Sequence, residues 1–69
     1  MVVQGDTQMV RVNTEKYEAS WGKKPRGYGL WWFRIGTEDF TSTGTYSNAA
    51  KDAVAMARVL RQTEVVVLP

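Results

Sequence analysis

The chain has 69 residues, enough for one domain whose single core is close to the smallest that folds without a disulfide or a metal. It contains no cysteine and no histidine, which excludes a disulfide framework, a zinc thiolate site, a cysteine nucleophile and histidine acid–base catalysis. The formal net charge is only +2, so any site for a polyanion must be local rather than a property of the whole surface.

We expect a single domain over residues 1–69, located in the cytoplasm and without a membrane partner. The longest uninterrupted apolar runs, "LWWF" and "VVVL", are far too short to span a bilayer, and no secretory segment is recognisable. The absence of cysteine suits a reducing compartment.

The N-terminal third of the chain predicts an arm, a strand and a loop. Residues 1–8 lack sustained periodicity and are predicted to form a loose arm or a short edge strand. Residues 9–21 contain recurring β-prone side chains, and strand alternation places Tyr17 and Trp21 on one face. The segment "GKKPRGYG" has the Gly and Pro residues of a loop and predicts that a long β-hairpin turns there.

The segment "LWWFRI" gives the strongest strand pattern in the chain. A period of two sends one set of side chains into the core and the other to the opposite face; the predicted core set is Trp31, Phe33 and Ile35, and the outward set is Leu30, Trp32 and Arg34. The segment "GTED" then predicts a tight turn and "FTSTGTY" a third, largely solvated strand, which completes a three-stranded meander.

At residue 47 the pattern changes to that of a helix. "SNAAKDAVAMARVLRQ" places Ser47 as the N-cap before an alanine-rich run. A spacing of 100° per residue gathers a small-residue stripe that can pack closely on the bulky strand residues: Ala49, Ala53, Met56, Ala57 and Leu60. The final "EVVVLP" predicts a fourth strand that pairs with an edge of the meander.

These elements predict an α+β fold in which an antiparallel sheet of three to four strands carries one α-helix on one face, in the order β-β-β-α-β. No enzymatic chemistry is indicated. Glu38 and Asp39 are adjacent in a turn and have no further acid nearby to complete a metal site, and the many hydroxyls lack a base. "GKKPRG" precedes a strand instead of a helix, unlike a phosphate-binding loop. We therefore expect no enzyme, no metal and no cofactor.

The candidate binding residues are the cations of the loop and the outward side chains of the second strand: Lys23, Lys24, Arg26, Trp32 and Arg34. A turn needs no cations, and a Leu, Trp and Arg row beside a cationic loop is typical of a contact surface. Two simpler interpretations stay open at this point. The cations are a solvated hairpin tip, or the arm or last strand covers Trp32.

Three functions fit these residues. The first is a nucleic-acid-binding module in which the loop cations contact phosphates and the exposed strand face contacts bases. The second is an inhibitor or antitoxin-like module that binds a protein through the same surface or by strand addition. The third is a homodimer formed through edge strands, in which Trp32 becomes buried at the interface.

Several families share parts of this pattern. "WWFRIGTEDFTSTGTYSNAAKDAVAMARVL" resembles the later half of double-stranded RNA-binding domains. "RGYGLWWFRI" followed by "GTYSNAAKDA" is similar to the three-stranded-sheet DNA-binding domains of the ethylene-response-factor type and of tyrosine-recombinase arm-binding domains. That resemblance implies that Arg26, Trp32 and Arg34 face DNA.

Two further resemblances imply a different kind of partner. "KYEAS", "GYGLWWF" and "GTYSNAAKDAV" resemble HicB-type antitoxins, which implies binding to a partner protein. "GKKPRGYGLWWF" with "GTYSNA" and the final "VVVLP" also resembles small proteins of phages and mobile elements. For such proteins, binding a host nucleic acid or protein is a common role.

Overall fold

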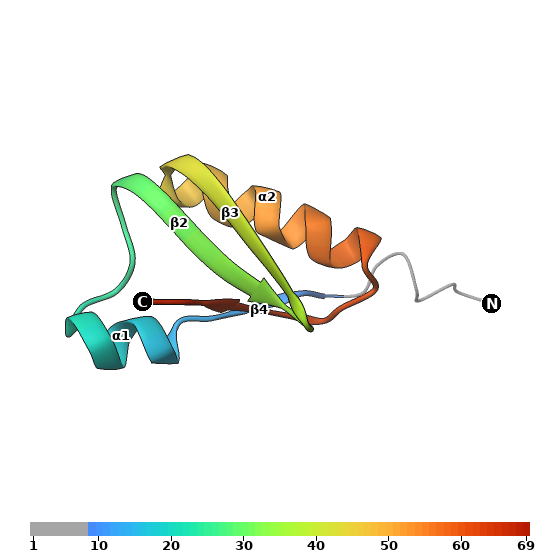
Figure 1. The fold of residues 1–69 in the computed structure, drawn as a ribbon, viewed down its shortest axis with the longest axis horizontal. Helices are drawn as coiled ribbons and strands as arrows, with labels where there is room; N and C mark the ends of the chain where they lie inside the picture. Colours follow the sequence, from blue (N-terminus) through green and yellow to red (C-terminus); the bar gives the residue numbers. More distant parts are fainter. Residues whose placement is uncertain (1–8) are drawn as a thin grey trace.

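The computed structural model describes residues 9–69 (Figure 1). The expected arm at 1–8 lies outside the described residues. Along the chain the elements are β1 (Arg11–Asn13), α1 (Glu15–Trp21), β2 (Tyr28–Ile35), β3 (Glu38–Thr45), α2 (Tyr46–Val59) and β4 (Glu64–Val67). The predicted α+β class is confirmed, but residues 9–69 contain two helices instead of the one expected.

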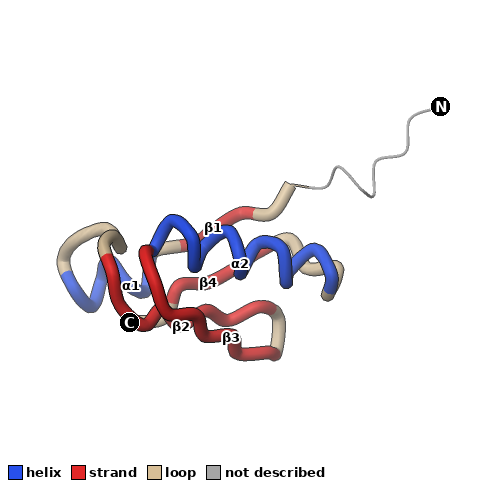
Figure 2. Tube along the Cα trace, turned by 90° about the horizontal axis from the view of Figure 1, so that it is seen from above, coloured by secondary structure: helices blue, strands red, loops and turns tan. Residues whose placement is uncertain are grey.

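The strands form one four-stranded sheet in the order β1-β4-β2-β3, with α2 packed over it (Figure 2). β2 is antiparallel to both β3 and β4, whereas β1 is parallel to β4, so the predicted purely antiparallel sheet is wrong. The predicted three-stranded meander is also wrong. The strand that precedes the loop pairs with β4 at the other side of the sheet and not with β2.

The prediction of one strand over 9–21 is wrong because a helix takes up most of this segment. Only Arg11–Asn13 is extended, and Glu15–Trp21 forms α1. The Asn13 side chain accepts a hydrogen bond from the Glu15 N–H at 2.9 Å, and Glu15 and Glu18 place negative charge in the first turn. Gly22 ends the helix in the left-handed conformation at φ 71°, which glycine adopts without steric cost. The loop at 22–27 therefore joins a helix to β2 and closes no hairpin.

The second and third strands agree closely with the prediction. β2 and β3 form a hairpin around the turn at Gly36 and Thr37, with an uninterrupted register from Tyr28 opposite Thr45 to Ile35 opposite Glu38. Trp31, Phe33 and Ile35 are buried, as the alternation predicted. The indole N–H of Trp31 donates to the Gly44 carbonyl at 3.1 Å, so the one polar atom of this ring is satisfied.

The helix α2 begins two residues earlier than predicted. The N-cap is Thr45 and not Ser47, because the Thr45 hydroxyl accepts the backbone N–H of Asn48 at 3.3 Å. From the predicted stripe, Ala49, Ala53 and Ala57 are fully buried, while Met56 and Leu60 stay partly exposed at its margin.

We expect the Thr45→Ala variant to lose about 1 kcal/mol of stability, because it removes the side-chain acceptor that caps α2. The matched control is Ser47→Ala, which changes a hydroxyl that lies inside the helix and is exposed. The measurement is the urea midpoint of both variants. Equal midpoints for the two would contradict Thr45 as the cap.

The core lies between α2 and the covered face of the sheet. It combines the rings of Trp31 and Phe33 with Ile35, the three buried alanines and two valines of β4, Val65 and Val67. Small helix side chains let α2 approach these rings closely, which confirms the predicted complementarity of sizes. Tyr46 at the start of α2 adds an edge-on contact with Trp31, with ring centroids 5.1 Å apart.

The last strand was expected beside the hairpin, and β4 does pair with β2. It is not an edge strand, however, because β1 pairs with its other side. Val65 and Val67 face α2 and Val66 is half-buried on the other face. A run of β-branched residues fits a strand that is paired on both sides.

Candidate functional site

The face of the sheet opposite α2, here called the open face, carries the outward row of β2. Tyr28, Leu30 and Trp32 are 80%, 69% and 46% exposed. The half-exposed Trp32 excludes the interpretation that the last strand covers it. Across the hairpin this row meets threonines of β3, with Leu30 opposite Thr43 and Trp32 opposite Thr41. The open face is therefore apolar along β2 and hydroxyl-rich along β3.

The two arginines of the open face are both paired with carboxylates. Arg34 Nε donates to Asp39 Oδ1 at 2.9 Å, and Arg11 Nη2 lies 3.6 Å from Glu64 Oε2. The hydrogen bond to Asp39 raises the pKa of Arg34, and the same bond from Arg34 lowers the pKa of Asp39. The positive charge of the predicted site residue Arg34 is thus already balanced by the carboxylate of Asp39, which weakens the attraction of Arg34 for a polyanion.

The loop at 22–27 carries the other three predicted cations. Lys23, Lys24 and Arg26 are all exposed, whereas Pro25 between them is buried. Gly27 at φ 91° then turns the chain into β2, and its carbonyl accepts the N–H of Tyr46. A buried proline and this hydrogen bond hold the loop in place, while its charged side chains stay in solvent.

A groove of about 410 Å³ lies between this loop, α1, the first half of β2 and the residues after β4. We call it the aromatic groove. Arg26 and Trp32 both line it, together with Trp21 of α1, Tyr28 and Leu68. Figure 1 shows why these segments meet: α1 lies beside the end of β4, and the loop leads from it to the start of β2. No aspartate or glutamate side chain lines the groove.

Two residues of the aromatic groove were not predicted from the sequence. Trp21, 58% exposed, sits on the last turn of α1 against Tyr17, with ring centroids 6.0 Å apart. Tyr28 is the first residue of β2 and the most exposed ring of the described chain. Tyr17 in turn packs on Trp31 at 5.7 Å, so Trp21 is anchored through the core. Their positions in the sequence could have indicated this role, since Trp21 and Tyr28 stand on either side of the cationic loop.

The structure therefore divides the predicted site. Arg26 and Trp32 line the same groove, whereas Lys23 and Lys24 lie in the same loop as Arg26 and do not line it. Arg34 lies two residues further along β2, bound to Asp39.

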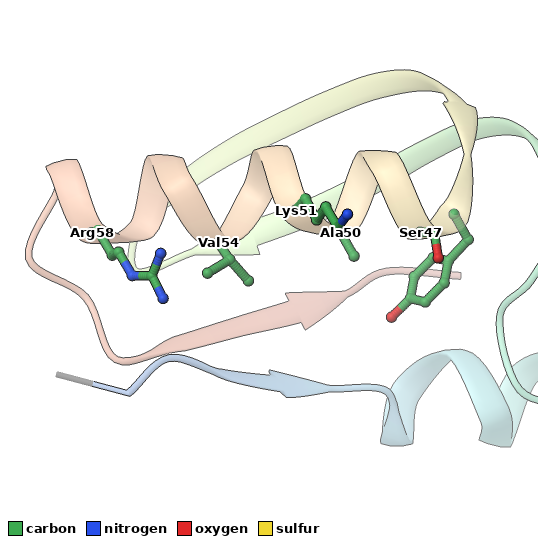
Figure 3. Close-up of a pocket in the computed structure, with 6 residues that line it drawn as sticks. Ser47, Ala50, Lys51, Val54 and Arg58 are labelled. Carbon is green, nitrogen blue, oxygen red and sulfur yellow. The ribbon is translucent and has the colours of Figure 1, made fainter. Parts of the chain in front are cut away.

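A second cavity, of about 430 Å³, is lined by α2 alone (Figure 3). Lys51 and Arg58 contribute two cations to it, and Ala50 and Val54 provide an apolar floor. Burial raises the pKa of Tyr46 at one end of it. Because one helix supplies the whole lining, this cavity has no second element to fix a ligand, and the aromatic groove is the better candidate.

Within residues 9–69 there is no cluster of three or more carboxylate, histidine or cysteine side chains that could hold a metal ion. Over the same residues, no helix is long and apolar enough to cross a membrane.

Comparison of the chain with models of protein families, with curated proteins and with solved structures gives no match.

Proposed function

We propose that the protein is a non-enzymatic module that binds unpaired nucleic acid in the aromatic groove. Bases stack on Tyr28 and Trp32, and Lys23, Lys24 and Arg26 hold the phosphates beside them. The observation that carries the proposal is that three exposed rings and a guanidinium share a groove that no aspartate or glutamate side chain lines. Aromatic platforms next to cations are the usual means of binding single strands.

The distribution of charge favours unpaired strands over duplex. Residues 19–33 contain three cations and no acid, and all three cations lie in one loop. On the open face, by contrast, Arg11 and Arg34 are paired with carboxylates. A duplex needs a row of free cations along its backbone, whereas a single strand needs only stacking rings and a local patch. We place this activity in the cytoplasm, in keeping with a chain that lacks cysteine.

The test is a titration of labelled single-stranded DNA, single-stranded RNA and a duplex of the same sequence, at about 50 mM and about 200 mM salt. We expect the single strands to bind more tightly than the duplex and to weaken with salt. Failure of both single strands to bind at the lower salt concentration would reject the proposal.

The first variant changes Lys23, Lys24 and Arg26 to glutamine. We expect its plot of the logarithm of the binding constant against the logarithm of salt concentration to be shallower by about 2, since each phosphate contact on a single strand contributes about 0.7 to the slope. The matched control changes Lys51, Arg58 and Arg61 to glutamine. It has the same net charge, but these exposed cations lie on α2 or just after it, away from the groove. An equal loss of slope in both variants would mean that overall charge, and not this loop, attracts the strand.

A protein partner is the second candidate, and one observation favours it. β4 pairs with β2 only at Phe33 and Arg34, followed by a bond from the Leu68 N–H to the Trp32 carbonyl at 2.9 Å. The stretch Tyr28–Leu30 therefore extends past the end of β4, where an extended peptide could add to the sheet. If a protein is the partner, neither single strand should bind at the lower salt concentration, so the same titration separates this candidate from the first proposal.

A further inference from the structure

The free edge of β3 is the longest unpaired strand edge among residues 9–69. β3 pairs with β2 on one side, and no described strand pairs with its other side. All eight residues from Glu38 to Thr45 are in register with β2, so no bulge bends the edge away. The strand contains neither lysine nor proline, the residues that usually protect an edge from another chain.

The hydrogen-bond pattern tells which backbone groups point outward. Tyr46 donates its N–H to the Gly27 carbonyl. In the antiparallel ladder, the backbone N–H and C=O groups of the even-numbered residues of β3 therefore point to β2. The N–H and C=O groups of Asp39, Thr41 and Thr43 therefore point to the free edge. Their side chains lie on the open face, whereas Ser42 and Phe40 lie on the face covered by α2.

We propose that β3 pairs with β3 of a second copy of this chain, antiparallel and centred on Ser42. In this register Thr41 of each copy lies opposite Thr43 of the other, and the two residues exchange both backbone hydrogen bonds. Threonine pairs of this kind are favourable across strands. The sheet becomes continuous over both copies.

The residue sizes along the edge select this register. Centring on Ser42 places Phe40 of one copy opposite Gly44 of the other, where a Cβ would meet open space. A large ring beside an edge glycine fills the gap that the glycine leaves. Centring one residue earlier places Glu38 opposite Gly44 instead, which leaves the gap unfilled.

The charges and the apolar side chains along this edge also favour antiparallel pairing with a second copy of the chain. The acids Glu38 and Asp39 lie at one end of β3, so antiparallel pairing keeps those of the two copies apart, whereas parallel pairing brings them together. Met56 and Leu60 of α2, 37% and 38% exposed, border Phe40 at this edge and offer apolar contact to the second copy. The aromatic groove lies on the far side of β2 and stays open in the dimer.

The register can be tested by disulfide formation, because the chain has no cysteine of its own. Ser42 faces its own counterpart at a position without direct hydrogen bonds, where Cα atoms are about 4.5 Å apart and a disulfide fits. We expect Ser42→Cys to form a disulfide-linked dimer under mild oxidation at least about tenfold faster than Thr41→Cys or Thr43→Cys. Faster linkage of either threonine variant would reject this register.

The association itself is tested by the mass in solution of the unmodified protein. We expect about twice the 7.8 kDa of one chain by light scattering after size exclusion. Thr43→Pro removes an outward N–H without touching the β2 ladder, and should return the mass to that of one chain while the circular dichroism spectrum is retained. A monomeric mass for the unmodified protein at high concentration would overturn the proposal. A dimer that Thr43→Pro leaves intact, while it stays folded, would do the same.

Discussion

The Phe33→Ala variant is expected to lose most of the stability of the fold at 25 °C. Phe33 is fully buried between the sheet and α2, and its ring contacts those of Phe40 and Tyr46, with centroids 6.3 and 6.5 Å away. Removing a buried phenylalanine side chain costs about 3–5 kcal/mol. A chain of this length has a total stability of only about 3–10 kcal/mol. The small alanines of α2 cannot fill the space, so the loss consumes most of the stability.

The measurement is urea unfolding followed by tryptophan fluorescence and circular dichroism. Leu30→Ala is the matched control, because Leu30 belongs to the same strand but projects from the open face and is 69% exposed. Its stability should change by no more than about 0.5 kcal/mol. A Phe33→Ala protein as stable as Leu30→Ala would contradict the placement of the core on the α2 side of the sheet.

The sequence was sufficient to predict the elements from Leu30 onward because period and residue propensity agree in each. Trp31, Phe33 and Ile35 alternate over a short β-prone run, and the alanines at 49, 53 and 57 share one face of a helix within a run of strong helix formers. The segment at 9–21 was different. Tyr17 and Trp21 are four residues apart, a spacing that places two side chains on one face of a strand and also of a helix.

Local signals could have decided this ambiguity in favour of α1. Two glutamates stand in the first turn, at Glu15 and Glu18, and Gly22 follows the last turn, an arrangement typical of a helix start and stop. What local sequence does not contain is the parallel pairing of β1 with β4, between residues more than fifty positions apart. That pairing places β4 inside the sheet and sets the position of α1 at its end.

The candidate site, like the fold, could be predicted from the sequence only in part. The alternation in β2 correctly placed Trp32 and Leu30 on the open face, and the loop cations are exposed as expected. The pairing of Arg34 with Asp39 follows from a two-residue turn at Gly36 and Thr37, which sets the two side chains opposite each other. The aromatic groove needed the tertiary fold, since Trp21 and Leu68 reach β2 only after β1 and β4 have paired.

The largest effect on binding is expected from the rings of the aromatic groove. If bases stack on Tyr28 and Trp32, replacing either with alanine should weaken single-strand affinity about 5- to 150-fold, the equivalent of about 1–3 kcal/mol for each lost stack. The double variant should bind too weakly to measure. Both residues lie on the open face, outside the core, so the variants should stay folded.

The controls separate stacking from apolar contact. Tyr28→Phe keeps the ring and should keep the affinity, because stacking needs the π-face and not the hydroxyl. Leu30→Ala removes an apolar side chain that lies between the two rings along the same row, and should change affinity little if bases stack on Tyr28 and Trp32. If Leu30→Ala weakens binding as much as Trp32→Ala does, the groove binds through general apolar contact, as a protein partner would. Affinity unchanged in the Tyr28 and Trp32 double variant would instead move the nucleic-acid site away from the open face.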